Sequence, residues 1–209
     1  MWLPILLTVI IGYLLGNLNG AVCMSYLMVH EDVRSHGSGN AGLTNFIRTY
    51  GAGKSLSVIL IDGGKAVAAC LIGGLLLRSY GMFREGTVIG GAAVMLGHVF
   101  PALLGFKGGK GILSGLFIAL TVDWRIALII LAVFAVAYFT TQYVSLGSVL
   151  GALTFAAGFA VLYHDNLVVM CCGIFMGLLS VFMHRENIVR LLKGQERKTN
   201  LFAKEKKQS

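Results

Sequence analysis

The sequence is poor in charged residues, and acidic residues are especially scarce. Only 12% of its 209 residues are charged and 56% are apolar, with nine Asp and Glu against seventeen Lys and Arg. Because a soluble domain carries about 25% charged residues, this composition argues against a water-soluble fold and favours an integral membrane protein. The four cysteines show no C-x-x-C spacing, and no His/Cys/Asp cluster has zinc spacing. We therefore expect neither a disulfide framework nor a metal site.

A basic segment before the first apolar run is also missing, which argues against a cleaved signal peptide. Apolar runs recur along the chain, at 3–28, 54–77, 86–104, 111–122, 125–141, 146–163 and 166–183. A membrane span needs about 20 apolar residues, and the run 111–122 is the weakest; seven spans is the predicted count, with five or six as alternatives. We predict an all-α integral membrane protein, with about seven transmembrane helices in a compact bundle. A single domain covers residues 1–209, with a basic tail at about 185–209.

The positive charges gather at one set of predicted loops. With seven spans, thirteen Lys and Arg fall on the same side as the tail and three fall on the other side. This asymmetry predicts a cytoplasmic C-terminus, an outside N-terminus and contact of the tail with anionic lipids. Nucleic-acid binding is the competing interpretation of a basic tail. One juxtamembrane tail with little aromatic interleaving argues against it.

Three polar, glycine-rich or basic clusters interrupt the apolar sequence, and all three fall on that inner side. The first cluster holds Gly37, Ser38, Gly39, Asn40, Thr44, Asn45 and Arg48. Exposed glycine N–H groups with uncharged donors beside an arginine form a nest suited to phosphate oxygens. The alternative is a flexible connecting loop. Such a loop would not need this density of polar side chains, so we interpret the cluster as a phosphate site.

The other two clusters add cations and a histidine. The second contains Lys107, Gly108, Gly109 and Lys110, and it can cradle an anion at the start of a helix. In the third, His184, Asn187 and Arg190 recur every three residues, so they share one helix face. Membrane anchoring would account for the cations of these clusters but not for His184 and Asn187. Within the second span, Asp62 and Lys65 should pair with each other or face the polar cavity.

Two nucleotide-binding interpretations fail. The spacing of Gly37, Gly39 and Gly42 matches G-x-G-x-x-G, but a membrane span precedes it where a Rossmann unit requires a strand. The segment 51–55 resembles the end of a Walker A loop, yet Arg48 stands where its first glycine should be. The clusters therefore predict phosphate binding without a nucleotide fold.

Together the clusters resemble the bacterial acyl-phosphate:glycerol-3-phosphate acyltransferase family over nearly the whole chain. The resemblance rests on four ordered motifs: 37–40 with 44–45 and Arg48, 97–98 with 100–101, 106–111, and 184–196. It implies active-site loops on the cytoplasmic face of a seven-helix bundle in the bacterial inner membrane. It also implies transfer of a fatty acyl group from acyl phosphate to the 1-hydroxyl of glycerol 3-phosphate, giving lysophosphatidic acid and inorganic phosphate. No cofactor is implied, and the upstream enzyme that makes acyl phosphate is a candidate partner.

The resemblance also suggests roles for individual residues. Expected catalytic residues are Ser38, Arg48, Lys107, His184 and Asn187. Expected substrate-binding residues are Gly37, Gly39, Asn40, Thr44, Asn45, Gly108, Gly109, Lys110 and Ser145. Either His184 or a substrate phosphate could accept the proton of the attacking hydroxyl.

Other functions stay open at this stage. The sequence argues against the class of acyltransferases that uses a His-x-x-x-x-Asp pair, because none of the five histidines is followed by Asp at that spacing. A transporter of an anionic solute is the main rival, and another membrane phosphate-transfer enzyme is a further alternative. A transporter fits less well, because the polar residues gather at one face and no inverted repeat is evident.

Overall fold

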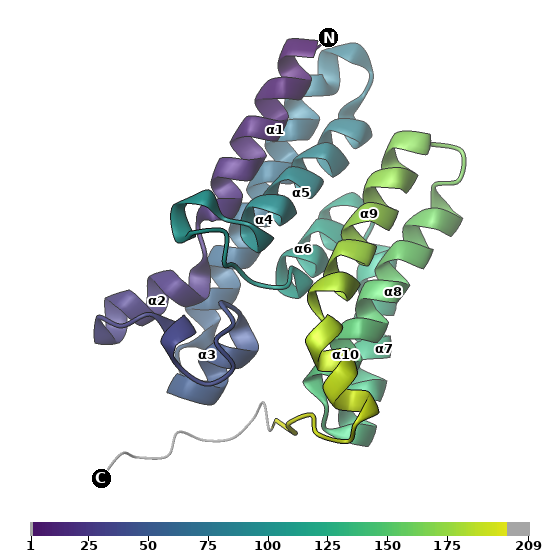
Figure 1. The fold of residues 1–209 in the computed structure, drawn as a ribbon. Coiled ribbons are helices and arrows are strands. Elements are labelled where there is room, and N and C mark those ends of the chain that lie inside the picture. The colour runs from purple at the N-terminus through teal and green to yellow at the C-terminus, as the bar shows by residue number, and fades with distance from the viewer. Residues whose placement is uncertain (1, 200–209) are drawn as a thin grey trace.

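The computed structural model describes residues 2–199, and helices are its only regular elements in that range (Figure 1). Ten α-helices and three short 3-10 helices follow one another along the chain. They are α1 (Trp2–Asn17), α2 (Gly20–Val29), η1 (Val33–Ser35), α3 (Leu43–Tyr50), α4 (Ser55–Leu77), η2 (Arg78–Tyr80), α5 (Phe83–Val99), η3 (Ala102–Leu104), α6 (Ile112–Val122), α7 (Trp124–Thr141), α8 (Val144–Leu162), α9 (Leu167–Met183) and α10 (Arg185–Leu192).

Each of the seven predicted apolar runs forms a helix. The first run is divided, because the chain leaves helical geometry at Leu18 and Asn19 and starts again as α2. The side chain of Asn19 accepts a hydrogen bond from the backbone N–H of Val22 at 3.0 Å, which caps the new helix. The sequence analysis missed α3, since a helix of eight residues beside the membrane has no long apolar run, whereas the three-residue spacing of Asn187 and Arg190 did predict the helix α10.

The helices differ in how far they can reach across a bilayer. Five segments are long and apolar enough by themselves, and α9 with α10 makes a sixth that bends by 55°. Helix α6 has 11 residues, about 16 Å at 1.5 Å per residue, against a hydrocarbon core of about 30 Å. The loop before α6 compensates for this shortfall by entering the bundle, where the Ser180 hydroxyl of α9 donates to the carbonyl of Lys110 at 3.0 Å. The path from this loop to the end of α6 therefore connects the two ends of the bundle.

Close backbone contacts hold the N-terminal helices together. A Cβ added to Gly16 of α1 would lie 2.4 Å from the carbonyl oxygen of Val94 in α5. One added to Gly73 of α4 would lie 2.2 Å from the carbonyl oxygen of Gly86. Small residues allow this approach where the lipid supplies no hydrophobic drive for helix association.

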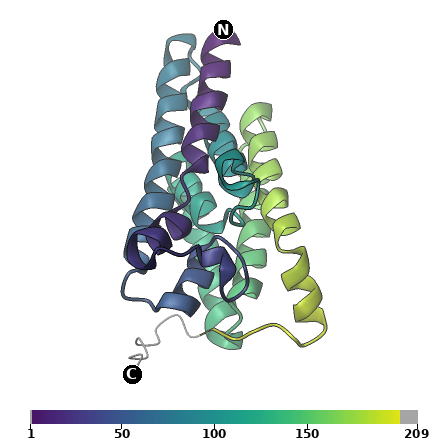
Figure 2. The ribbon, with the colours of Figure 1, turned by 60° about the vertical axis from the view of Figure 1, so that its left-hand side comes forward.

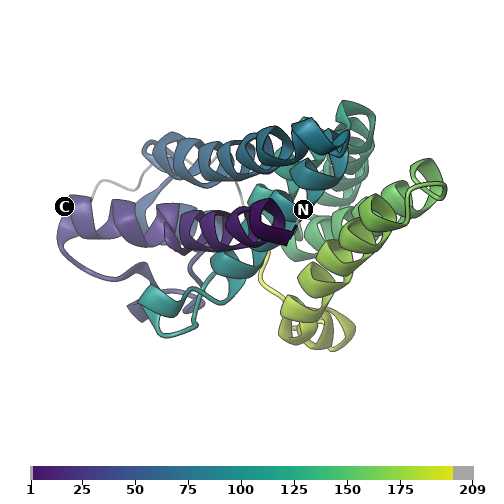
Figure 3. The same ribbon diagram turned by 90° about the horizontal axis from the view of Figure 1, so that it is seen from above.

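The bundle has two chemically different ends. At one end, Tyr163 donates to Asp123 at 3.0 Å and Asn166 donates to Glu85 at 2.7 Å, which joins the turns of three helical hairpins. At the other end lie α3, α10 and the polar clusters, and we call this the loop end (Figure 2). Viewed from above, α8 and α9 lie on the opposite side of the molecule from α1 and α4 (Figure 3). The loop end is therefore bounded by two separate groups of helices.

Candidate active site

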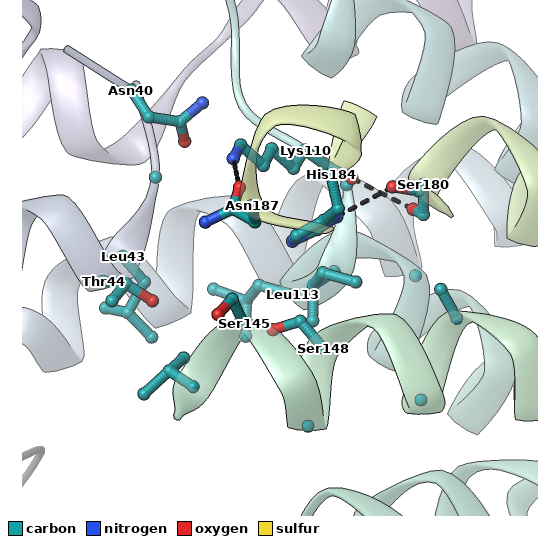
Figure 4. Close-up of a pocket in the computed structure, with 18 of the residues that line it drawn as sticks. Asn40, Leu43, Thr44, Lys110, Leu113, Ser145, Ser148, Ser180, His184 and Asn187 are labelled. Carbon is teal, nitrogen blue, oxygen red and sulfur yellow. Dashed lines mark hydrogen bonds between the residues drawn. The ribbon is translucent and has the colours of Figure 1, made fainter. Parts of the chain in front are cut away.

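A cavity of about 540 Å³ opens at the loop end, between the first polar cluster and helices α8 to α10. Figure 4 shows the side chains of Asn40, Thr44, Lys110, Asn187 and Ser145 around it. Most of the site residues expected from the sequence line this cavity, namely Ser38, Gly39, Asn40, Thr44, Asn45, Arg48, Lys110, Ser145, His184 and Asn187. The fold therefore brings the three clusters to one place.

Asn45 holds the shape of the first loop. Its side-chain oxygen accepts from the backbone N–H of Ser38 at 2.8 Å, and its amide donates to the carbonyls of Val33 and His36 at 3.0 and 3.1 Å. The residue is only 2% exposed, so these bonds occupy both its oxygen and its amide group. Asn45 thus acts on the loop backbone. Gly37 does not line the cavity; its φ of 61° and its closeness to Asn45 make it a turn residue.

The second cluster contributes one lysine to the cavity. Lys107 is exposed and does not line it, and its carbonyl accepts a hydrogen bond from Arg34 at 2.9 Å. Gly108 and Gly109 do not line it either, and their N–H groups donate to carbonyls at the end of α5. A Cβ on Gly109 would lie 2.2 Å from Nε2 of His98, so the loop needs glycine there to pack against that ring.

Lys110 extends into the cavity from this glycine turn. Its ammonium group donates to the side-chain oxygen of Asn187, which links the second cluster to the third. Burial lowers the pKa of Lys110 to about 8, and repulsion from nearby Arg190 adds to the shift. A partly desolvated ammonium group attracts an anion more strongly than an exposed one does.

His184 lies at the junction of α9 and α10 and is 4% exposed. Its Nδ1 is 2.8 Å from the carbonyl oxygen of Ser180, so Nδ1 carries the proton and Nε2 is left as an acceptor. A neutral ring with this tautomer presents its unprotonated Nε2 to a ligand.

Glu196 is a cavity residue to which the sequence analysis gave no role. Its carboxylate accepts from Asn187 at 2.9 Å and from Arg190 at 2.7 Å. Burial alone would raise the pKa of Glu196, but these two hydrogen bonds bring it below its ordinary value. The carboxylate fixes the side chains of α10 that face the cavity. Nearby, Ser145 also lines the cavity, with its buried hydroxyl facing the Glu196 carboxylate.

An ion pair lies behind the cavity, as the spacing of Asp62 and Lys65 predicted. Their charged groups are 2.7 Å apart, and the ammonium is also 2.9 Å from Nδ1 of His98. Asp62 accepts from the backbone N–H of Gly20 at 3.0 Å, while Lys65 donates to the carbonyl of Leu18. The pair therefore satisfies backbone groups freed by the break between α1 and α2. Both Asp62 and His98 line the cavity wall.

The deeper part of the cavity is apolar. Its walls come from helices α5 to α9 and include Met95, Leu113, Leu116, Ile130, Leu131, Phe134, Phe155 and Met176. The sequence gave no sign that these residues share a surface, because each lies in an apolar run like any other. One cavity thus joins a polar, cationic end to an apolar end, which suits an amphiphilic ligand.

Comparison with known proteins identifies the family of this chain. Residues 6–194 match the model of the family described as glycerol-3-phosphate acyltransferase. A protein of that name from Thermoanaerobacter sp. (strain X514) is 39% identical over 92% of this chain and 94% of its own length. Another from Finegoldia magna is 35% identical over 94% of this chain and 97% of its own length.

Solved structures show the same similarity. The glycerol 3-phosphate form of PlsY (YgiH), an integral membrane glycerol 3-phosphate acyltransferase, is 33% identical and superimposes with a TM-score of 0.83. That match covers 95% of this chain and 99% of the other. The lysophosphatidic acid form gives a TM-score of 0.80 at 32% identity, over 94% of this chain and 96% of the other. A family match over most of the chain, with relatives above one-third identity, shows that this chain belongs to the glycerol-3-phosphate acyltransferase family.

Proposed function

We propose that this chain transfers a fatty acyl group from acyl phosphate to the 1-hydroxyl of glycerol 3-phosphate. The products are lysophosphatidic acid, a precursor of phospholipids, and inorganic phosphate. The observation that carries the proposal is the single cavity with cations at one end and apolar walls at the other. Acyl phosphate has the same two-part chemistry, and glycerol 3-phosphate brings a second phosphate to the polar end.

The cavity favours direct transfer over an acyl-enzyme intermediate. Its lining contains no cysteine, and His184 pairs with a backbone carbonyl rather than with a serine hydroxyl. A serine nucleophile needs an adjacent base, whereas an acyl phosphate is already activated. We therefore assign the residues to holding two phosphates together and stabilising the oxyanion that forms at the carbonyl.

The cations have separate positions around the cavity. Arg48 reaches it from α3, Lys110 from the second loop and Arg190 from α10. In this proposal Ser38 and the Gly39 backbone bind the acyl phosphate, while Ser145, Asn187 and His184 orient the glycerol 3-phosphate. Lys110 takes the role that the sequence analysis gave to Lys107, because its ammonium group is the one inside the cavity.

The proton of the attacking hydroxyl goes to phosphate in this proposal. As the O1–acyl bond forms, the bond between the acyl carbon and the phosphate oxygen breaks, and the departing phosphate accepts the proton. The Nδ1 of His184 is held by the carbonyl of Ser180, so its Nε2 acts as a hydrogen-bond acceptor that orients the hydroxyl.

The protein works as one membrane-embedded domain of the bacterial inner membrane, with the loop end in the cytoplasm. The described cations support this orientation. Ten Lys and Arg lie at the loop end, whereas only Arg78, Arg84 and Arg125 lie at the other end. The basic face at α10 suits contact with anionic lipids, and the enzyme that makes acyl phosphate is a candidate partner for the same face. The end of the proposed tail, residues 200–209, lies outside the described residues.

The test follows inorganic phosphate released from palmitoyl phosphate by the purified protein in detergent or lipid mesophase. Phosphate release that depends on glycerol 3-phosphate, with lysophosphatidic acid formed in equal amount, is the expected result. Acyl-CoA and acyl carrier protein run as alternative donors. Turnover with either of them but not with palmitoyl phosphate would overturn the assigned donor, and a folded protein without any turnover would overturn the reaction.

A further inference from the structure

Residues 195–199 form an ordered segment that follows α10, and we call it the C-terminal strap. It lies beyond residue 194, where the family match ends. The strap has no regular secondary structure, yet its backbone is fixed: Thr199 donates to the carbonyl of Gln142 at 3.2 Å, and Tyr138 donates to the carbonyl of Thr199 at 3.1 Å. Figure 1 shows this yellow segment returning from α10 beneath the ends of α7 and α8.

The strap closes part of the cavity wall. Glu196 and Arg197 line the cavity, and Glu196 is anchored by Asn187 and Arg190 as described above. Thr199, at the other end of the strap, is only 6% exposed and is bonded to Tyr138, which is itself buried. The strap thereby connects α10 to the side of the cavity formed by α3.

That connection is made through Arg48. Nε of its guanidinium donates to the Thr199 hydroxyl at 2.7 Å, and Nη2 donates to the same oxygen. Nη2 also lies 3.3 Å from the carbonyl oxygen of Arg197. The hydrogen bonds between Arg48 and the described residues use this one edge of the guanidinium, which leaves Nη1 for a ligand in the cavity.

A long arginine side chain loses much rotamer freedom when it grips a phosphate. A side chain already held by its Nε edge loses less on binding, so the site is preorganised. The Thr199 hydroxyl is suited to this task because it accepts from Arg48 while its backbone is tied to α7 and the α7–α8 turn.

We propose that Thr199 is a positioning residue for the reaction: its hydroxyl orients Arg48 toward a substrate phosphate, and the C-terminal strap completes the active site. The proposal rests on the proposed function, since Arg48 is taken to bind phosphate. Thr199 itself does not touch the substrate.

The side chain of Thr199 can be tested without disturbing the strap, because the contacts of the strap with Gln142 and Tyr138 use backbone atoms. Thr199→Val removes the hydroxyl at constant shape, and Thr199→Ser keeps it. We expect the valine variant to raise the KM for one of the two phosphate substrates by about tenfold, the size of one lost hydrogen bond to a charged group. The serine variant should stay near the wild-type KM, and kcat and the melting temperature should change little in both.

A double-mutant cycle then separates positioning from a general structural role. If Thr199 acts through Arg48, adding Thr199→Val to Arg48→Ala should cause no further loss. Equal losses in both backgrounds, or a wild-type KM in Thr199→Val, would overturn the proposal.

Phosphate binding gives a readout that needs no turnover. Thermal shift with inorganic phosphate should show about tenfold weaker binding in Thr199→Val than in the wild type. An unchanged phosphate affinity in Thr199→Val would overturn the positioning role of Thr199, even if the acyltransferase assay itself had failed. Failure of the assay with the expected change in phosphate affinity would instead count against the proposed reaction alone.

Discussion

At the scale of single residues, the structure separates side chains that the sequence makes look equivalent. Lys107 and Lys110 flank the same two glycines, yet only Lys110 enters the cavity. Asn40 and Asn45 belong to the same cluster, yet the side-chain amide of Asn45 forms its hydrogen bonds with the loop backbone. The difference lies in which way the backbone turns at the glycines, and no local pattern states that direction.

The two lysines form a matched pair for mutation. Lys110→Ala should cost about 2–5 kcal/mol of transition-state stabilisation, roughly a 30-fold or greater loss in kcat/KM, because it removes a buried charged contact to phosphate. Lys107→Ala should change kcat/KM by about twofold at most, as expected for an exposed side chain. Steady-state kinetics with both variants checks this, with melting temperatures as the control for folding. Similar losses in the two variants would contradict the placement of Lys110.

The lowered pKa of Lys110 predicts a pH dependence. The lysine is charged below its pKa of about 8 and neutral above it, so kcat/KM should fall as pH rises through about 8. Burial favours the neutral form most, followed by Arg190 and Arg185, while Glu186 and Glu196 favour the charged form. Substrate phosphate monoesters titrate near pH 6, so their own charge is constant in this window. In Lys110→Arg the fall near pH 8 should disappear; a fall of the same size at the same pH would assign it to another group.

At the scale of elements, the site depends on breaks and close contacts within the bundle. The Asp62–Lys65 pair satisfies the backbone at the break between α1 and α2, and α2 leads into the first loop. Asn19 at this break also donates to the carbonyl of Ala41 at 3.0 Å. The buried charges thus connect the second span to the loop that lines the cavity.

Removing one charge of this pair should be strongly destabilising. Lys65→Met leaves the Asp62 carboxylate buried without its cation, at a cost of about 3–5 kcal/mol. The double variant Asp62→Asn, Lys65→Met should lose clearly less, because no charge is stranded and Asn can still accept from Gly20. Thermal unfolding in detergent measures both. If the double variant is no more stable than Lys65→Met, the unpaired buried charge of Asp62 is not the cause of the destabilisation.

Glycine packing between helices gives a second matched pair. Gly16→Ala in α1 places a methyl group against the backbone of α5, at 2.4 Å from the carbonyl oxygen of Val94, and should destabilise by about 1–3 kcal/mol. Gly64→Ala in α4 meets nothing within 4 Å, so removing a mid-helix glycine there should stabilise by about 0.5–1 kcal/mol. The unfolding midpoints of the two variants, each compared with the wild type, test this prediction. Equal shifts would show that α1 can move away from α5.

At the scale of the whole molecule, the bundle separates charge between its two ends. The polar clusters and most cations occupy the loop end, and the turns near Arg78, Asp123 and Tyr163 occupy the other end. A soluble, charged acceptor and a lipid-like donor would both reach a cavity at the loop end. The fold therefore suits a reaction at the membrane surface.

The proposed orientation can be measured by cysteine labelling in cells. In a background where the four native cysteines are replaced, Lys193→Cys should react with a membrane-impermeant maleimide only after the membrane is opened. Arg78→Cys should react in intact cells, because the positive-inside rule places the three cations of that end outside. The reverse labelling pattern would show that the loop end faces outward.

The sequence by itself determined the membrane class, the seven helical segments, the gathering of three polar clusters on one side and the family resemblance. These are properties of composition, apolar run length and local motif, which neighbouring residues along the chain express directly. The weak run at 111–122 was identified as the uncertain span, and it is indeed the short helix α6.

Only the tertiary structure decided which lysine faces the cavity, which apolar residues form its deep walls, and that Glu196 and Thr199 belong beside it. Each of these depends on contacts between residues far apart in the chain, such as Arg48 with Thr199 or Lys110 with Asn187. Such contacts follow from helix rotation and loop direction, which the packing of all helices sets together. A local sequence pattern therefore does not predict these long-range contacts.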